Sequence, residues 1–127
     1  MKSVTLAIVI CGILLGGAVY PAQPGNAEFL VGGDISMLAE IEDHGGVFRD
    51  DGKARDAMRI LRDHGCNCFR LRIFVDPDGH NAVVQDLQYT VKMAQRIKES
   101  GAKLLLDFHY SDTWADPGKQ IKPEAWE

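Results

Sequence analysis

The sequence predicts an α/β fold built on a parallel sheet. Three apolar segments with the character of strands alternate with two segments of helical periodicity, in the order strand, helix, strand, helix, strand. The strands begin near Leu30, Asn67 and Lys103, so successive repeats are 37 and 36 residues long. Repeats of this length are typical of one β/α unit of a (β/α)₈ TIM barrel, which needs about 250 residues. We therefore expect the 127-residue chain to hold about the first three β/α units of such a barrel, as the N-terminal part of a larger domain.

The first unit is predicted to contain a strand over residues 29–36 and a helix over residues 55–64. The helix is indicated by positions at i, i+3, i+4 and i+7 that form one inner stripe, namely Ala57, Ile60, Leu61 and His64. Gly65 follows as the C-terminal stop signal. The sequence Asp-Asp-Gly at residues 50–52 marks a turn in the connection before this helix.

The second and third strands are predicted over residues 66–75 and 103–110, with a helix between them. Asp86 is the expected N-cap of that helix, which runs to Ser100, and Gly101 lies just past its end. Its inner stripe is predicted to be Leu87, Val91, Ala94 and either Ile97 or Lys98. Asp-Pro-Asp-Gly at residues 76–79 marks a turn after the second strand.

Residues 1–27 have the pattern of a secretory signal peptide. Lys2 precedes an apolar run over residues 4–19, and two prolines and a glycine follow. The run is shorter than the roughly 20 residues that span a bilayer, so we expect cleavage, with a retained anchor as the alternative. Small residues fit cleavage after Ala18 or after Ala27. The sequence predicts a domain over residues 28–127 that is secreted, extracellular or periplasmic, without membrane contact once the signal is removed.

Charge and cysteine content point to a neutral ligand and to no metal or redox chemistry. Lys and Arg total 14 against 18 Asp and Glu, so no overall field favours nucleic acid or an anionic membrane. Cys66 and Cys68 are two residues apart on a predicted strand, where their side chains are about 6 to 7 Å apart and cannot form an unstrained disulfide. We interpret both as small buried apolar residues.

The third strand carries the clearest sign of a functional site. Leu105, Asp107 and His109 share one face of an otherwise apolar strand, because side chains alternate with a period of two. The loop that follows holds Asp112 and Trp114. Polar side chains at the carboxyl end of a parallel barrel strand, next to such a loop, are typical of a binding or catalytic site.

The second strand adds two arginines on the corresponding face. Arg70 and Arg72 point into the predicted barrel, while the alternate aliphatic residues pack on helices. A buried arginine needs a partner, and Asp34 on the first strand and Asp107 on the third are the expected ones. For Arg70 a structural ion pair is the favoured interpretation, whereas Arg72 lies nearer the carboxyl end, where barrel sites form.

Five segments, taken in order, closely resemble glycoside hydrolase family 53, the endo-β-1,4-galactanases that act on arabinogalactan. They are GGDIS (residues 32–36), ILRDHG (60–65), RLRIFVDP (70–77), LLLDFHYSDTWADP (104–117) and KQIKPEAW (119–126). The resemblance extends over residues 29–126. It implies a (β/α)₈ barrel and a retaining mechanism with two glutamates, an acid/base after strand four and a nucleophile after strand seven. The implied activity is endo-hydrolysis of β-1,4-galactan in pectin side chains.

The resemblance assigns no catalytic residue to this sequence. A retaining glycosidase places two carboxyl groups about 5 to 5.5 Å apart across the scissile bond. None of the glutamates at positions 28, 40, 42, 99, 124 and 127 matches the asparagine-glutamate pair of the family. Both catalytic glutamates are therefore expected beyond Glu127, and the chain alone is expected to be inactive.

The resemblance also suggests roles in substrate binding or in supporting the site. Arg72 matches an arginine that orients the nucleophile and keeps it ionised, and His109 matches a histidine near the −1 sugar or the catalytic carboxylates. Trp114 offers a flat apolar face for a galactose ring, with core packing as the alternative. Asp34, Ser36 and Asp112 are candidates to accept hydrogen bonds from sugar hydroxyls, with a local capping role as the alternative for each of the three.

Two other classes of function were weighed. A metal-dependent hydrolase would use Asp107 and His109 as ligands, but the His-x-His expected on the first strand is absent, so we expect no metal and no cofactor. A non-catalytic carbohydrate-binding protein or degenerate barrel remains the alternative to an enzyme. The expected partner is a neutral polysaccharide, and the full-length protein is expected to be a monomer.

Overall fold

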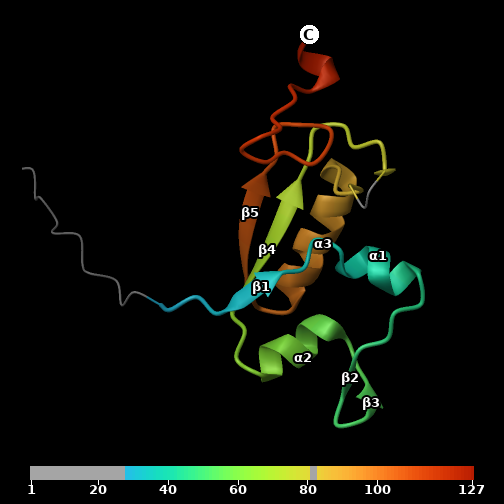
Figure 1. Ribbon diagram of the computed structural model, residues 1–127. Coiled ribbons are helices and arrows are strands. Elements are labelled where there is room, and N and C mark those ends of the chain that lie inside the picture. Colours follow the sequence, from blue (N-terminus) through green and yellow to red (C-terminus); the bar gives the residue numbers. More distant parts are fainter. Residues whose placement is uncertain (1–27, 81–82) are drawn as a thin grey trace, which may run out of the picture.

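The computed structural model describes residues 28–80 and 83–127 (Figure 1). The predicted signal peptide and its two cleavage positions lie outside the described residues. The strands that build the main sheet are β1 (Gly32–Asp34), β4 (Cys68–Ile73) and β5 (Lys103–Phe108). They pair in parallel in the order β1-β4-β5, which is their order along the chain. The predicted parallel sheet is therefore confirmed.

The helices and a small hairpin connect these strands. Between β1 and β4 the chain forms α1 (Leu38–Asp43), the antiparallel strands β2 (Arg49–Asp50) and β3 (Lys53–Ala54), and α2 (Ala57–Asp63). Helix α3 (Leu87–Glu99) connects β4 to β5, and a 3₁₀ turn (Glu124–Trp126) lies near the C-terminus. In Figure 1 the chain after β5 gathers at the arrowhead ends of β4 and β5, while α2 and the hairpin lie toward the opposite end of β4.

The core lies between the sheet and the helices. Phe69 and Leu71 on β4 are 0% and 1% exposed, and they belong to one apolar cluster with Met93 and Ile97 of α3 and Met58 of α2. This confirms that the aliphatic face of the second predicted strand packs on helices. Because side chains alternate along a strand, Arg70 and every second residue from it project from the other face of the sheet.

The predicted inner stripe of α3 was wrong in detail. Ile97 is buried and Ala94 packs against the core, as predicted, but the other buried residues are Thr90 and Met93, whereas Leu87 is 65% exposed and Val91 is 47% exposed. Both sets have helical spacing, so periodicity alone does not decide which one faces the sheet. The helix bounds are close to those predicted, since Asp86 accepts a hydrogen bond from the Tyr89 backbone N–H at 2.7 Å and acts as the N-cap.

The stripe of α2 also differs from the prediction. Ala57 and Met58 are buried, Ile60 and Leu61 are partly buried, and His64 is exposed. His64 instead contacts the Asp50 carboxylate of the hairpin at 3.1 Å. A histidine at the end of a short helix therefore faces a charged neighbour and water rather than the core.

The strand bounds and the first connection account for the other differences. Strand β1 has three residues, whereas a strand of eight residues was predicted there. β4 and β5 are also shorter than predicted. Helix α1 and the β2–β3 hairpin were not predicted as elements. The predicted turn at residues 50–52 is present, with positive φ at Asp51 (47°) and Gly52 (76°). None of the helices in residues 28–80 and 83–127 is long and apolar enough to cross a membrane.

Candidate functional site

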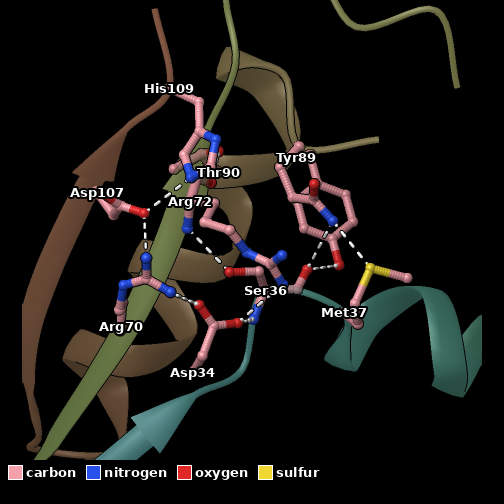
Figure 2. A network of polar contacts seen from close by, with 10 residues as sticks. Asp34, Ser36, Met37, Arg70, Arg72, Tyr89, Thr90, Asp107 and His109 are labelled. Carbon is pink, nitrogen blue, oxygen red and sulfur yellow. Dashed lines mark hydrogen bonds and ion pairs between the residues drawn. The ribbon is translucent and has the colours of Figure 1, made fainter. Parts of the chain in front are cut away.

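The parallel register gathers the predicted polar residues at one end of the sheet (Figure 2). Asp34 of β1 lies beside Arg70 of β4, and Arg70 lies beside Leu105 of β5. Two residues further along each strand, Arg72 lies beside Asp107, and His109 follows directly after β5. The result is a cluster of charged side chains. It lies on the face of the sheet opposite the one that the described helices cover.

Two carboxylates and two guanidinium groups pair within this cluster. Arg70 Nη1 donates to Asp34 Oδ2 at 2.5 Å, and Arg70 Nη2 donates to the Asp107 carboxylate. Arg72 Nη2 donates to the other Asp34 oxygen, Oδ1, at 3.1 Å. Asp34 therefore bridges both arginines, which confirms the predicted pairing of the strand arginines with Asp34 and Asp107. The Arg72 side chain is the more buried of the two, at 14% exposed against 39% for Arg70.

The surroundings of Asp34 keep it ionised. Burial acts to raise its pKa, but hydrogen bonds from the backbone and side chain of Ser36, the charge of Arg72 and a hydrogen bond from Arg70 outweigh that effect. The pKa of Asp34 is consequently below its ordinary value of 3.8. The cluster thus holds a fixed negative charge between two positive ones at neutral pH.

His109 closes the cluster at the end of β5. Its Nε2 lies 3.0 Å from Asp107 Oδ2, and its ring centroid lies 4.6 Å from that of Phe74. The other ring nitrogen, Nδ1, is buried and has no hydrogen-bond partner among the described residues. A buried polar atom without a partner is costly, so this nitrogen marks a place where a further group is expected to bind.

Trp114 lies over Arg72. The guanidinium carbon is 4.6 Å from the centroid of the indole ring, within the range of a cation–π contact. The edges of Phe74 and His109 also approach this ring, at 5.7 and 6.1 Å between centroids. One face of the indole is therefore occupied by Arg72. Arg72 Nε is a second buried nitrogen without a hydrogen-bond partner among the described residues.

Ser36 and Asp112 hold main-chain groups in this structure. Ser36 is completely buried, and its Oγ accepts a hydrogen bond from the Arg72 backbone N–H at 2.8 Å. Asp112 accepts from the backbone N–H groups of Asp76 at 3.0 Å and Glu124 at 2.9 Å, one to each carboxylate oxygen. Asp112 thus connects two loops and the C-terminal turn. A role for either residue in contacting a sugar stays a prediction.

The structure adds residues that were not singled out from the sequence. The Tyr89 hydroxyl donates to the Ser36 carbonyl at 2.7 Å, and Gln85 Nε2 donates to the same oxygen at 3.3 Å. Phe74 is 2% exposed and lies against His109 and Trp114. The alternation of the second predicted strand places Phe74 on the same face as the arginines, so its place at the site could have been predicted from the sequence. Nothing in the local sequence indicates that Tyr89 and Gln85 reach the end of β1.

The described residues offer no cluster of side chains that would hold a metal ion, since no group of three or more His, Cys, Asp or Glu side chains among them is arranged to do so. Cys66 and Cys68 are free thiols; Cys68 is buried as predicted, whereas Cys66 is only partly buried. Glu42 pairs with Arg96 at 2.7 Å, and Glu28 pairs with Lys103, both away from the cluster.

Comparison with known proteins gives a consistent result. The model of Glycosyl hydrolase family 53 matches residues 30–127. The chain is 49% identical over 100 residues to a protein of Niallia circulans described only by its position beside another gene, with 78% of this chain and 26% of that protein covered. It is 40% identical over 129 residues to the arabinogalactan endo-β-1,4-galactanase of Cellvibrio japonicus, which covers 99% of this chain and 32% of that enzyme.

A solved structure supports the same assignment. The GH53 catalytic domain of Ignisphaera aggregans superposes with a TM-score of 0.72 at 40% identity, over 81% of this chain and 31% of that domain. The chain thus spans about a quarter to a third of the length of these relatives. Its parallel β/α units are part of a TIM barrel, as predicted. On the match over residues 30–127, this chain belongs to glycosyl hydrolase family 53.

Proposed function

We propose that this chain is part of an endo-acting galactanase that cleaves β-1,4-galactan in arabinogalactan. The observation that carries the proposal is the cluster of Asp34, Arg70, Arg72, Asp107 and His109 at the carboxyl ends of three neighbouring barrel strands, where barrel enzymes place their sites. The family match and the name of the Cellvibrio japonicus relative give the reaction and the substrate. Because the chain spans about a third of that relative, the activity belongs to the whole protein.

The reaction that we propose is a retaining displacement with two glutamates. One protonates the leaving glycosidic oxygen and the other attacks the anomeric carbon, with the carboxyl groups about 5 to 5.5 Å apart. We place both glutamates on barrel strands that follow Glu127 in the whole protein. The part of the machinery within this chain is Arg72, which is fixed by Asp34 and Trp114 and retains a buried Nε for a further acceptor. A guanidinium beside a carboxylate nucleophile lowers its pKa and keeps it ionised.

His109 and Trp114 are proposed to contact the sugar. In the tautomer whose Nε2–H faces Asp107, the buried His109 Nδ1 is a hydrogen-bond acceptor. A donor such as a sugar hydroxyl or a protonated catalytic carboxyl would satisfy it. Trp114, beside Arg72 in the loop after β5, is proposed to contact the C–H side of a galactose ring, since an aromatic ring binds a neutral sugar through its apolar surface. Neither contact requires a charged ligand, which agrees with a neutral polysaccharide as the partner.

The location and assembly of the protein are part of the same proposal. A polysaccharide substrate lies outside the cell, and the apolar run over residues 4–19 provides a route of export. We therefore propose a secreted protein that acts as a monomer and binds neither nucleic acid nor, after signal removal, the membrane.

The proposal is tested by extending the chain and assaying it. A protein that continues about 200 residues past Glu127, enough for five further β/α units, is expected to release oligosaccharides from β-1,4-galactan. The 127-residue chain assayed in parallel is expected to release none. An extended protein that binds galactan without cleaving it would instead show a non-catalytic carbohydrate-binding barrel.

A further inference from the structure

The carboxyl end of β1 is held in place by side chains rather than by the sheet. β1 pairs with β4 over only three residues, and the last main-chain bond between the two segments is from Ile35 N–H to the Arg70 carbonyl at 3.1 Å. Ser36 follows directly and is completely buried. Its position beside Arg72 therefore depends on the side-chain hydrogen bonds around it.

Tyr89 in the first turn of α3 and Gln85 in the segment before this helix bind one side of Ser36. The Tyr89 hydroxyl donates to the Ser36 carbonyl at 2.7 Å, and Gln85 Nε2 reaches the same oxygen at 3.3 Å (Figure 2). The Gln85 carbonyl also accepts from the Phe74 backbone N–H at 2.9 Å, so this segment contacts the chain just after β4. The shorter of the two bonds to Ser36 belongs to Tyr89.

The other side of Ser36 faces the charged cluster. Ser36 N–H donates to Asp34 Oδ1 at 3.0 Å, and Ser36 Oγ accepts from the Arg72 backbone N–H at 2.8 Å. Asp34 Oδ1 in turn accepts from Arg72 Nη2 at 3.1 Å. A continuous path of hydrogen bonds therefore runs from the Tyr89 hydroxyl through Ser36 to the carboxylate that orients the Arg72 guanidinium.

We infer that Tyr89 is a positioning residue of this enzyme, whose hydroxyl fixes Ser36 and thereby the geometry of the Asp34–Arg72 pair. This inference rests on the proposed function, in which Arg72 supports the nucleophile. Without the hydroxyl, the Ser36 carbonyl loses the shorter of its two side-chain hydrogen bonds among the described residues and keeps the longer one from Gln85, so the end of β1 is less firmly fixed. A shift of about 1 Å in a catalytic arrangement lowers turnover by up to about a hundredfold.

The test compares four variants in the extended protein, three single and one double. Tyr89→Phe removes only the hydroxyl and leaves the ring in place. Ser100→Ala is the matched control, because it removes a hydroxyl that bonds to the Ile97 carbonyl at 2.7 Å at the opposite end of the same helix. Asp34→Asn, alone and combined with Tyr89→Phe, shows whether the two residues act along one path. The Asp34 carboxyl is also titrated by NMR in the wild-type and Tyr89→Phe proteins.

We expect Tyr89→Phe to lower kcat on β-1,4-galactan about tenfold or more, with KM changed less than about twofold. The same substitution is expected to have little further effect in the Asp34→Asn background, and Ser100→Ala is expected to keep wild-type kcat. The pKa of Asp34 should rise in Tyr89→Phe, because its hydrogen bonds from Ser36 weaken. The inference would be overturned if Tyr89→Phe keeps the wild-type kcat. It would also be overturned if Tyr89→Phe lowers kcat by the same factor in the wild-type and Asp34→Asn backgrounds.

The two proposals fail in different ways. If the wild-type extended protein does not cleave galactan, the proposed function is contradicted, and the positioning role is then decided by the titration alone. A higher Asp34 pKa in Tyr89→Phe supports it in that case, and an unchanged Asp34 pKa overturns it.

Discussion

The charged residues of the cluster lie together on one face of the sheet because they pair with one another. Each arginine of β4 has at least one carboxylate within hydrogen-bond distance, and Asp34 serves both. These pairs could be predicted from the sequence, because buried charges need partners and the parallel register restricts which partners are near. The Tyr89 and Gln85 contacts could not, since they join residues about 50 positions apart through side chains on a loop and a helix.

Arg72 is predicted to act through its planar, forked geometry. In the extended protein, Arg72→Lys should lower kcat on galactan far more than it lowers thermal stability, because an ammonium group cannot both bond to Asp34 and reach a second acceptor in the same plane. Galactan hydrolysis and thermal unfolding are measured on the same preparation. A normally folded Arg72→Lys protein with unchanged kcat would show that Arg72 does not support catalysis.

Trp114 is predicted to contribute to substrate binding. Trp114→Ala in the extended protein should weaken binding of a β-1,4-galacto-oligosaccharide by about 1 to 3 kcal/mol, the range for truncating a binding aromatic. Calorimetric titration gives the affinity, and a melting curve gives the stability. A large drop in melting temperature with unchanged affinity would mean that the indole serves to pack Arg72 and Phe74.

Asp34 is predicted to make stability depend on acid. Its pKa is lowered in the folded state, so its stabilising effect is present above the unfolded-state pKa near 3.8 and is lost as the pH falls through the lower folded value. The difference in unfolding free energy between wild type and Asp34→Asn should therefore be larger at pH 7 than at about pH 3. Denaturant titrations at both pH values measure it, and an equal difference at the two would contradict the assignment.

At the scale of elements, the sequence predicts the strands and long helix well and the first connection poorly. β4, α3 and β5 are identified by alternation, an N-cap and a terminal glycine. α1 has six residues, and β2 and β3 have two each, so they are too short for periodicity to show. The N-terminal half of the predicted α3 stripe, Leu87 and Val91, was wrong, because burial is decided by the sheet that the helix packs on and two overlapping stripes of helical spacing compete.

The N-cap of α3 gives a test at this scale. The Asp86 side chain accepts from the Tyr89 backbone N–H at 2.7 Å, so Asp86→Ala should destabilise the extended protein by about 1 kcal/mol, whereas Asp86→Asn should cost less. The matched control is Gln88→Ala, in the exposed first turn of the same helix. Equal unfolding free energies for Asp86→Ala and Gln88→Ala would show that the cap has no energetic role.

At the scale of the whole molecule, three parallel strands with helices on one face leave much of the barrel surface uncovered. Leu105 on the cluster face is 53% exposed, and Phe108 on the other face of β5 is 55% exposed. Parallel sheets are stable when both faces and both edges are covered. These exposures agree with the relatives being three to four times as long as the chain.

The 127-residue chain expressed alone is accordingly predicted to be molten or prone to aggregation. It should bind a hydrophobic dye and give poorly dispersed NMR signals, whereas the extended protein should do neither. A cooperative unfolding transition and a dispersed spectrum from the isolated chain would contradict this expectation.

The most direct test of the galactanase proposal is the anomeric form of the first product. The extended protein is incubated with β-1,4-galactan, and the new reducing ends are followed by proton NMR before they mutarotate. A retaining reaction with two glutamates predicts that the β-anomer appears first. No release of oligosaccharides, or initial appearance of the α-anomer, would contradict the proposed activity or its mechanism, respectively.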